Sequence, residues 1–270
     1  MPGLRHSARL KGSAMRCVGY GLNIRTVVPI PGAMAATTDA PVDVEVDYGT
    51  PPPWPETVAW GPYRVRDVDR FDFTMPNLAR YTITDRRRIT ISPERGADET
   101  LIAAMLVATA LPVLLWARGD TVLHAAAASG SVDGPGWLIL GDSGSGKSSR
   151  LVKALRSGAY AIADDSVRLR LEGDRVLASG LPGGVFSRAS GPDDPRVFLP
   201  TPVGQQLREC PVAMGQLIEP DGGARNAVGL VALTALLRHR HRPRILGLLG
   251  IEAAAINPLA RIAKSLRLTG

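Results

Sequence analysis

The chain has 270 residues, of which 45% are hydrophobic and 21% are charged, and this composition excludes a disordered chain. Lys and Arg number 32 against 25 Asp and Glu, so the net charge is +7, which favours anionic partners without specifying one. The two cysteines, Cys17 and Cys210, fit neither a C-x-x-C pair nor a metal-ligand spacing, so a cysteine-based metal site is not expected and a reducing cytoplasm is the predicted compartment.

Residues 1–15 are predicted to form a flexible tail, because their basic residues are not followed by the apolar core of a signal peptide. Residues 16–97 are predicted to form a small β-rich domain. Its clearest strand is 42–48, where apolar and acidic residues alternate as in a half-buried strand. Further strands are predicted at 16–26, 63–65, 71–75, 79–84 and 88–92, with a hairpin turn at 85–87, a loop at 28–32 and a proline-rich loop at 50–55.

A long apolar helix is predicted to open the second domain, residues 98–270, with Asp98 as its N-cap. The stretch 101–117 contains no charged residue and is near the lower length limit of a membrane span. Pro112 interrupts this stretch and Arg118 follows it directly, so a helix buried beneath a sheet is the preferred interpretation, with a membrane span as the alternative.

The stretch Gly141 to Ser148 reads G-D-S-G-S-G-K-S and fits the P-loop pattern G-x-x-x-x-G-K-[ST] at every fixed position. An apolar strand, 137–140, precedes it and a helix, 149–157, follows it. Glycines allow the backbone N–H groups to point at phosphate oxygens, and the helix N-terminus adds further N–H groups. Lys147 would neutralise the β- and γ-phosphates, and the Ser148 hydroxyl would hold Mg²⁺. The predicted nucleotide-binding residues are Gly141, Asp142, Ser143, Gly144, Ser145, Gly146, Lys147, Ser148 and Ser149.

The remaining elements follow from short patterns around this loop. A strand at 121–129 is separated from the P-loop strand by a connection too short for a parallel crossover, so the two should be antiparallel. After the P-loop helix, which Gly158 ends, we expect a strand at 160–163, a hairpin at 167–178, a mobile loop at 180–204, a helix at 227–237 and a mostly helical segment at 245–266.

Asp164 and Asp165 follow the strand after the P-loop helix, where a phosphoryl-transfer site needs its carboxylates. One of them can order the metal, and the other can accept the proton of the acceptor hydroxyl. The alternative is a structural turn, which Asp-Asp-Ser would also suit. His124, on the strand beside the P-loop strand, could contact phosphate or orient an aspartate, or serve only the fold. The basic stretch 238–244 could interact with a helix C-terminus or dock phosphate or peptide.

His124, the P-loop and the segments Arg156-Ser157-Gly158 and Ala161 to Val167 together resemble the catalytic domain of the HPr kinase/phosphorylase family. This resemblance covers less than a fifth of the chain and implies a serine kinase on a largely antiparallel sheet. It implies that Asp165 is the proton acceptor, that Lys147 and Ser148 contact phosphate and Mg²⁺, and that His124 assists catalysis. Asp164 is then left as the carboxylate for the metal. The glutamate-containing loop of that family has no counterpart between Ser179 and Gly204, so a kinase without phosphorylase activity is expected.

The N-terminal part differs from that family. Tyr20-Gly21-Leu22-Asn23-Ile24 and Val28-Pro29-Ile30-Pro31 are similar to HPr-kinase-like proteins of lasso-peptide biosynthesis. That resemblance implies phosphorylation of a serine at the C-terminus of a precursor peptide.

The sequence therefore predicts an α/β protein whose P-loop catalytic domain, on a mixed and largely antiparallel sheet, follows a small β-rich domain. The expected function is a cytoplasmic kinase that uses ATP and Mg²⁺ to phosphorylate a serine, with a lasso-type precursor peptide as the leading acceptor and an HPr-like carrier protein as the second. A homo-oligomer is expected by analogy only. No nucleic-acid or membrane partner is expected. A non-catalytic nucleotide sensor and a nucleic-acid-dependent ATPase stay as alternatives.

Overall fold

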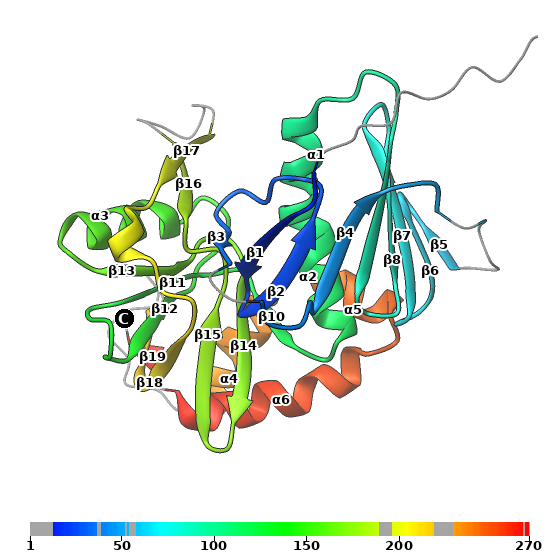
Figure 1. The fold of residues 1–270 in the computed structure, drawn as a ribbon. Helices are drawn as coiled ribbons and strands as arrows, with labels where there is room; N and C mark the ends of the chain where they lie inside the picture. The colour runs from blue at the N-terminus through cyan, green and yellow to red at the C-terminus, as the bar shows by residue number, and fades with distance from the viewer. Residues whose placement is uncertain are drawn as a thin grey trace, which may run out of the picture.

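The computed structural model describes residues 13–36, 39–51, 53, 58–188, 196–218, 229–266 and 268–269. It contains a nine-stranded sheet built from the N-terminal part, an eight-stranded sheet built from the remainder and a separate pair of strands (Figure 1). Helices accompany both large sheets, so the mixed α/β class is confirmed. Most of the predicted tail, part of the proline-rich loop, residues 189–195 of the predicted mobile loop and the start of the predicted helix at 227 lie outside the described residues.

The N-terminal sheet is mostly antiparallel, but β4 runs parallel to both of its neighbours. Its strands are β1 (Met15–Gly19), β2 (Leu22–Thr26), β3 (Met34–Ala35), β4 (Val44–Tyr48), β5 (Val58–Trp60), β6 (Tyr63–Asp67), β7 (Arg70–Met75), β8 (Ala79–Thr84) and β9 (Arg88–Pro93), in the order β3-β1-β2-β4-β9-β8-β7-β6-β5. The strand predicted at 16–26 is instead a hairpin, because Tyr20 and Gly21 both have positive φ angles and form its two-residue turn. β3 and β5 were not predicted.

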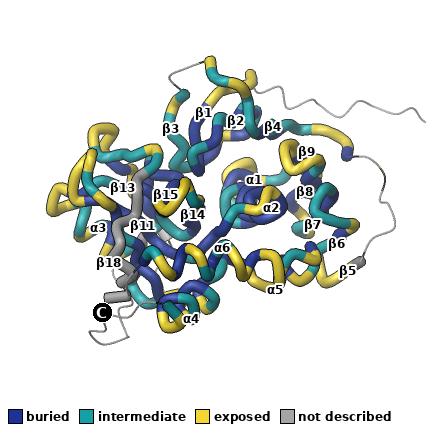
Figure 2. Tube along the Cα trace, turned by 90° about the horizontal axis from the view of Figure 1, so that it is seen from below, coloured by how far each residue is buried: buried dark blue, intermediate teal, exposed yellow. Residues whose placement is uncertain are grey.

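One face of this sheet packs on the apolar helix. The helix consists of α1 (Glu99–Met105), the π-helical turn η1 (Leu106–Ala110) and α2 (Leu111–Ala117), and Asp98 caps it as predicted. By length and composition Glu99–Ala117 could cross a membrane, but 67% of its apolar window is buried inside the structure (Figure 2). Its side chains share one core with the apolar face of the nine-stranded sheet, as expected for a core helix. The domain boundary at residue 97 stays a prediction.

Pro112 explains the irregular middle of this helix. Proline has no N–H to donate to the carbonyl four residues earlier, which leaves the Ala108 oxygen without its helical partner. Arg242 Nε donates to that oxygen over 2.9 Å. One residue of the basic stretch 238–244 therefore serves the fold.

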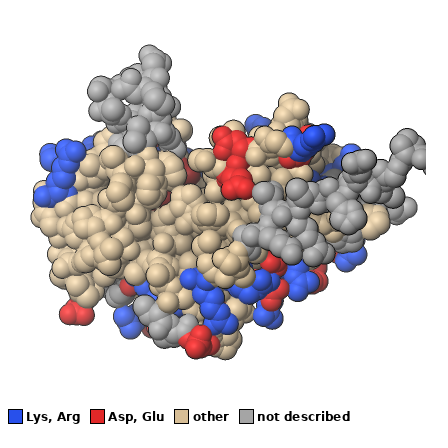
Figure 3. Space-filling model, turned by 45° about the horizontal axis from the view of Figure 1, so that its top comes forward, with Lys and Arg blue, Asp and Glu red and all other residues tan. Residues whose placement is uncertain are grey.

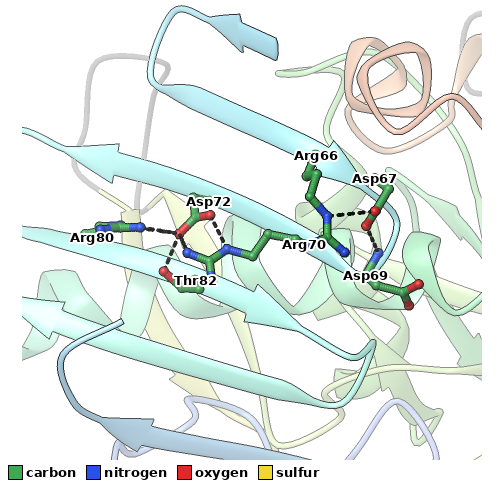
Figure 4. A network of polar contacts seen from close by, with 7 residues as sticks. All are labelled: Arg66, Asp67, Asp69, Arg70, Asp72, Arg80 and Thr82. Atoms are coloured by element: carbon green, nitrogen blue, oxygen red, sulfur yellow. Dashed lines mark hydrogen bonds and ion pairs between the residues drawn. The ribbon is translucent and has the colours of Figure 1, made fainter. Parts of the chain in front are cut away.

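The opposite face of the N-terminal sheet carries a network of charged side chains (Figure 4). At its centre Asp72 on β7 is fully buried and accepts from Arg70 Nε at 2.7 Å, from Arg80 at 2.9 Å and from the Thr82 hydroxyl. Nearby, Asp69 forms an exposed ion pair with Arg86. Asp72 thus has charged partners on its own strand and on the neighbouring strand, β8.

The second sheet is also mainly antiparallel. Its strands are β10 (Thr121–Leu123), β11 (Ala126–Ser129), β12 (Gly136–Ile139), β13 (Tyr160–Ala163), β14 (Val167–Glu172), β15 (Arg175–Ser179) and β18 (Cys210–Ile218), in the order β10-β14-β15-β18-β12-β11-β13, with β19 (Leu268–Thr269) beside β18. β11 and β12 are antiparallel, as predicted, whereas β12 and β18 are parallel. The predicted hairpin at 167–178 is β14 and β15.

Helices cover both faces of this sheet. Ala126 and Ala128 of β11 pack toward α3 (Lys147–Arg156), and the alternate residues Ala125 and Ala127 pack toward the C-terminal helices. Those helices are α4 (Leu230–Arg238), α5 (Pro243–Leu248) and α6 (Glu252–Ser265). The predicted helical segment 245–266 is therefore two helices. The small alanine side chains let the helices approach the sheet closely from either side.

Two predictions about this half are wrong. The predicted strand 121–129 is broken at His124 and Ala125, where the chain passes from β10, at one end of the strand order, to β11, the strand next to the other end. Because only two residues separate β10 from β11, the ends of the sheet must lie close together. The predicted loop 180–204 contains a hairpin, β16 (Gly184–Arg188) and β17 (Arg196–Pro200), followed by the short helix η2 (Val203–Gln205). Its strand pattern is obscured by glycine and proline.

Candidate functional site

The P-loop connects β12 to α3 in the strand, loop and helix order that its motif requires. Gly144 and Gly146 have φ angles of +87° and +86°, which residues with a side chain rarely adopt. A Cβ atom at Gly141 would lie 2.3 Å from Ser145 Oγ, which is buried without a protein partner. Glycines are therefore needed for this loop conformation. The loop leads into the first turn of α3, where the backbone N–H groups have no partner within the helix. Asp142, Ser143 and Ser149 are exposed around it.

Lys147 is buried and its ammonium group lies over the loop. Its Nζ donates to the carbonyl oxygens of Gly141 and Asp142, at 2.8 and 3.0 Å. A third contact, of 3.0 Å, joins Nζ to Nε2 of His124. The positive charge is therefore held beside the loop, where it can neutralise an anionic ligand.

Ser148 and Asp164 lie together, as the sequence predicted for a metal site. The Ser148 hydroxyl donates to the Asp164 carboxylate, with distances of 2.9 and 3.1 Å to the two oxygens. The backbone N–H of Phe186 donates to the same carboxylate over 3.0 Å. One hydroxyl and one carboxylate are suitable oxygen ligands for Mg²⁺, which usually binds few protein groups and keeps water and phosphate oxygens. Among the described residues, no cluster of three or more metal-binding side chains is present.

His124 connects Lys147 to the second aspartate. A lysine ammonium can only donate, so His124 Nε2 accepts and its Nδ1 carries the proton. Nδ1 then donates to the backbone oxygen of Asp165 over 3.0 Å, and the Asp165 carboxylate lies 3.5 Å from the same nitrogen. The Asp165 side chain is 32% exposed, so it can be reached by an acceptor. This contact chain supports a role of His124 in the site rather than in the fold alone.

The strand order explains why these residues meet. β10 pairs with β14, and β11 pairs with β13, so the links β10 to β11 and β13 to β14 both pass between the same two parts of the sheet. His124 lies on the first link, and Asp164 and Asp165 lie on the second. The P-loop follows β12, the neighbour of β11. Three segments that are distant in sequence therefore converge at one edge of the eight-stranded sheet.

Two further histidines lie behind His124. The backbone N–H of His124 donates to the His239 oxygen over 2.7 Å, and the N–H of His241 donates to the Val122 oxygen over 2.9 Å. The His241 ring is 6.3 Å from that of His124, and its buried Nδ1 has no hydrogen-bond partner. Burial lowers the pKa of His241 from 6.5 to about 3, against the opposing effect of the Asp165 charge. His241 is therefore neutral at physiological pH.

Arg238 reaches the P-loop from the end of α4, where it pairs with the carboxylate of Asp142. This hydrogen bond holds the pKa of Asp142 below its usual value. Both side chains are largely exposed. On the face shown in Figure 3, the described Lys and Arg side chains form small groups separated by other residues rather than one continuous basic surface.

The structure brings together Asp164, Asp165, His124, Lys147 and Ser148, although their roles stay predictions. Sequence reasoning missed three neighbours. These are Phe186, whose contribution is a backbone N–H, His241, and Tyr20 of the N-terminal hairpin, which bonds to the residue after Asp165. No sequence pattern singled out His241. Its position becomes evident only in the structure, where three of the four histidines lie near the site.

No protein-family model and no curated protein matches the sequence. Among solved structures, the chain is similar to the Hpr(Ser) kinase/phosphatase from Coxiella burnetii, with 18% sequence identity and a TM-score of 0.32. The alignment covers 40% of this chain and 77% of that chain.

Proposed function

We propose that the protein is an ATP-dependent kinase that transfers the γ-phosphoryl group to a serine hydroxyl of a peptide. The observation that carries this proposal is the pairing of two adjacent carboxylates with different partners. The Asp164 carboxylate accepts from the P-loop residue Ser148, whereas the Asp165 carboxylate lies 3.5 Å from Nδ1 of His124. One carboxylate is therefore suited to the metal and the other to the acceptor, the division of roles that phosphoryl transfer requires.

The P-loop, from Gly141 to Ser149, would hold the triphosphate through its backbone N–H groups. Lys147 would neutralise charge on the β- and γ-phosphates, and Ser148 with Asp164 would hold Mg²⁺. When bound, Mg²⁺ supplies further charge neutralisation on the phosphate oxygens. The buried hydroxyl of Ser145 and the ammonium group of Lys147 are consistent with a polyanion at this position.

Asp165 is the proposed proton acceptor. Both ring nitrogens of His124 already have hydrogen-bonding partners, so this imidazole is better suited to orient Asp165 than to accept the proton. In the transfer, the serine oxygen forms a bond to the γ-phosphorus while the bond from that phosphorus to the β,γ-bridging oxygen breaks. The hydroxyl proton passes to the Asp165 carboxylate and ADP is released.

For the acceptor, we propose the C-terminal serine of a lasso-type precursor peptide. The support is the resemblance of Tyr20 to Ile24 and Val28 to Pro31 to the precursor-peptide kinases. An HPr-like carrier protein is the second candidate. A cytoplasmic homo-oligomer without phosphorylase activity completes the proposal.

The test is mass spectrometry of both acceptors after separate incubation with the protein, ATP and Mg²⁺. Phosphate on the peptide alone is the expected result, whereas phosphate on HPr alone would assign the protein to the carrier acceptor. The Asp165→Asn variant should retain nucleotide affinity, measured by titration with a fluorescent ATP analogue, and lose about 10²- to 10⁴-fold in transfer rate. If the variant lost nucleotide affinity but kept its transfer rate, Asp165 would not be the base. No phosphate on either acceptor would favour a nucleotide sensor.

A further inference from the structure

The turn of the first hairpin contains an unusual residue. Tyr20 has a φ angle of +55° and is 1% exposed, in a two-residue turn where asparagine or aspartate is favoured before glycine. A bulky residue in this backbone conformation is strained, and it persists only when its surroundings fix it. The hairpin belongs to the nine-stranded sheet, but its turn reaches the eight-stranded sheet (Figure 1).

Every polar group of Tyr20 bonds to the eight-stranded half of the molecule. Its hydroxyl is 2.6 Å from Ser166 Oγ, and its carbonyl oxygen accepts from Arg168 over 2.8 Å. Its N–H donates to the Gly180 oxygen over 2.7 Å. Arg168 is itself fixed by an ion pair with Asp120, at 2.8 Å. The turn is therefore bonded at three points around the segment that links β13 to β14.

This segment contains both aspartates of the site. Ser166, which bonds to Tyr20, is buried and directly follows Asp165. Its N–H donates to the Asp164 oxygen over 2.9 Å, which closes a tight turn, and Asp165 within that turn has a φ angle of +68°. On the other side, a Cβ atom at Gly180 would lie 2.2 Å from the Cβ of Ala163, so Gly180 packs directly against the end of β13. Tyr20 thus contacts the residue directly after Asp165, and through Gly180 it is linked to the end of β13, which precedes Asp164.

We propose that Tyr20 is a positioning residue, which holds the turn of Asp164 and Asp165 in the conformation needed for phosphoryl transfer. The inference rests on the proposed kinase function. It gives the N-terminal sheet a part in ordering the carboxylate turn of the P-loop half, because the strained turn and the carboxylate turn are joined by hydrogen bonds. Tyr20 would act on Asp165 through Ser166 and would not touch nucleotide or acceptor.

The test uses Tyr20→Phe, which keeps the ring and removes only the hydroxyl. We expect kcat to fall about 2- to 10-fold, the rate equivalent of one hydrogen bond, with the KM for ATP unchanged. Ser166→Ala should have a similar effect, and the double variant should be no worse than the poorer single variant, because both remove the same bond. Hydrogen exchange of residues 164–168 should become faster in both single variants.

Tyr81→Phe is the matched control. The Tyr81 hydroxyl is also buried and donates to the Ile102 oxygen over 2.9 Å, but it lies within the nine-stranded half. Its loss should lower stability without changing kcat or exchange at 164–168. Unchanged kcat and unchanged exchange in Tyr20→Phe would overturn the proposal, and so would additive effects in the double variant. If the wild type phosphorylated neither acceptor, the kinase proposal would fail, and the exchange measurement alone would still decide whether Tyr20 orders the turn.

Discussion

Two groups of charged side chains, one on each large sheet, contain aspartates in opposite situations. Asp72 is fully buried between arginines on β7 and β8, and its carboxylate accepts from Arg70, Arg80 and Thr82 (Figure 4). The Asp165 side chain is 32% exposed, and its carboxylate lies 3.5 Å from Nδ1 of His124. Both aspartates lie within reach of cations or imidazole, yet only the second can be approached by another molecule.

This difference separates a charge used for stability from a charge available for chemistry. A buried carboxylate must be neutralised by fixed partners, because an uncompensated charge inside the protein is costly. Asp72 has such partners within its own sheet. The charges around the P-loop lie where segments from several strands converge, and a ligand can contribute the remaining interactions. We therefore expect substitutions in the two groups to affect different properties.

The largest expected effect is that of Asp72→Asn. The change removes the carboxylate charge that faces the buried Arg70 and the partly buried Arg80, so the free energy of unfolding should fall by about 3–5 kcal/mol. Urea unfolding followed by circular dichroism measures this loss. Asp69→Asn, in the exposed pair with Arg86, is the matched control and should change stability by less than about 0.5 kcal/mol. Asp165→Asn should resemble the control in stability, and a large loss there would mean that Asp165 supports the fold instead.

A smaller effect is expected from His241, which is buried like Asp72 but lies beside the site. Its pKa is lowered from 6.5 to about 3, mainly by burial, so the folded state keeps it neutral while the unfolded state gains a proton below pH 6.5. The stabilising contribution is therefore complete above pH 6.5 and is lost as the pH falls toward 3. At pH 5 the loss should be roughly 2 kcal/mol relative to pH 8, at about 1.4 kcal/mol for each pH unit.

The measurement is urea unfolding of the wild type and of His241→Phe at pH 8 and pH 5. Carboxylates contribute to the pH dependence of both proteins, so the comparison between them isolates His241. The variant should lose about 2 kcal/mol less stability than the wild type between the two pH values. An equal loss in both would show that His241 is protonated in the folded state.

The local elements could be predicted from the sequence, whereas their convergence could not. Alternation identified β4, and the P-loop motif identified the loop between β12 and α3, because both depend on neighbouring residues. The short connection also predicted the antiparallel pair β11 and β12 correctly. These are consequences of chain geometry over a few residues.

The contact of His124 with Asp165 depends on a sheet whose ends lie close together, and no short pattern encodes that arrangement. The predicted strand 121–129 concealed the break at His124, because its residues are apolar on both sides of the break. The bond from Tyr20 to Ser166 links positions 146 residues apart and depends on how the two halves pack. Phe186 contributes only its backbone N–H, so its side chain gives no signal.

The smallest expected effect concerns the exposed pair of Asp142 and Arg238, which extends the comparison to a charge at the surface of the P-loop. Asp142 is ionised at neutral pH, because the bond from Arg238 holds its pKa low. Its negative charge lies in the loop that would bind a triphosphate. Asp142→Asn should therefore strengthen binding of a fluorescent ATP analogue, about two- to fivefold at ~50 mM salt, and the gain should largely disappear at ~500 mM salt. Stability should not change, because exposed ion pairs contribute little. Weaker binding at both salt concentrations would show instead that Asp142 and Arg238 hold the P-loop in its binding conformation.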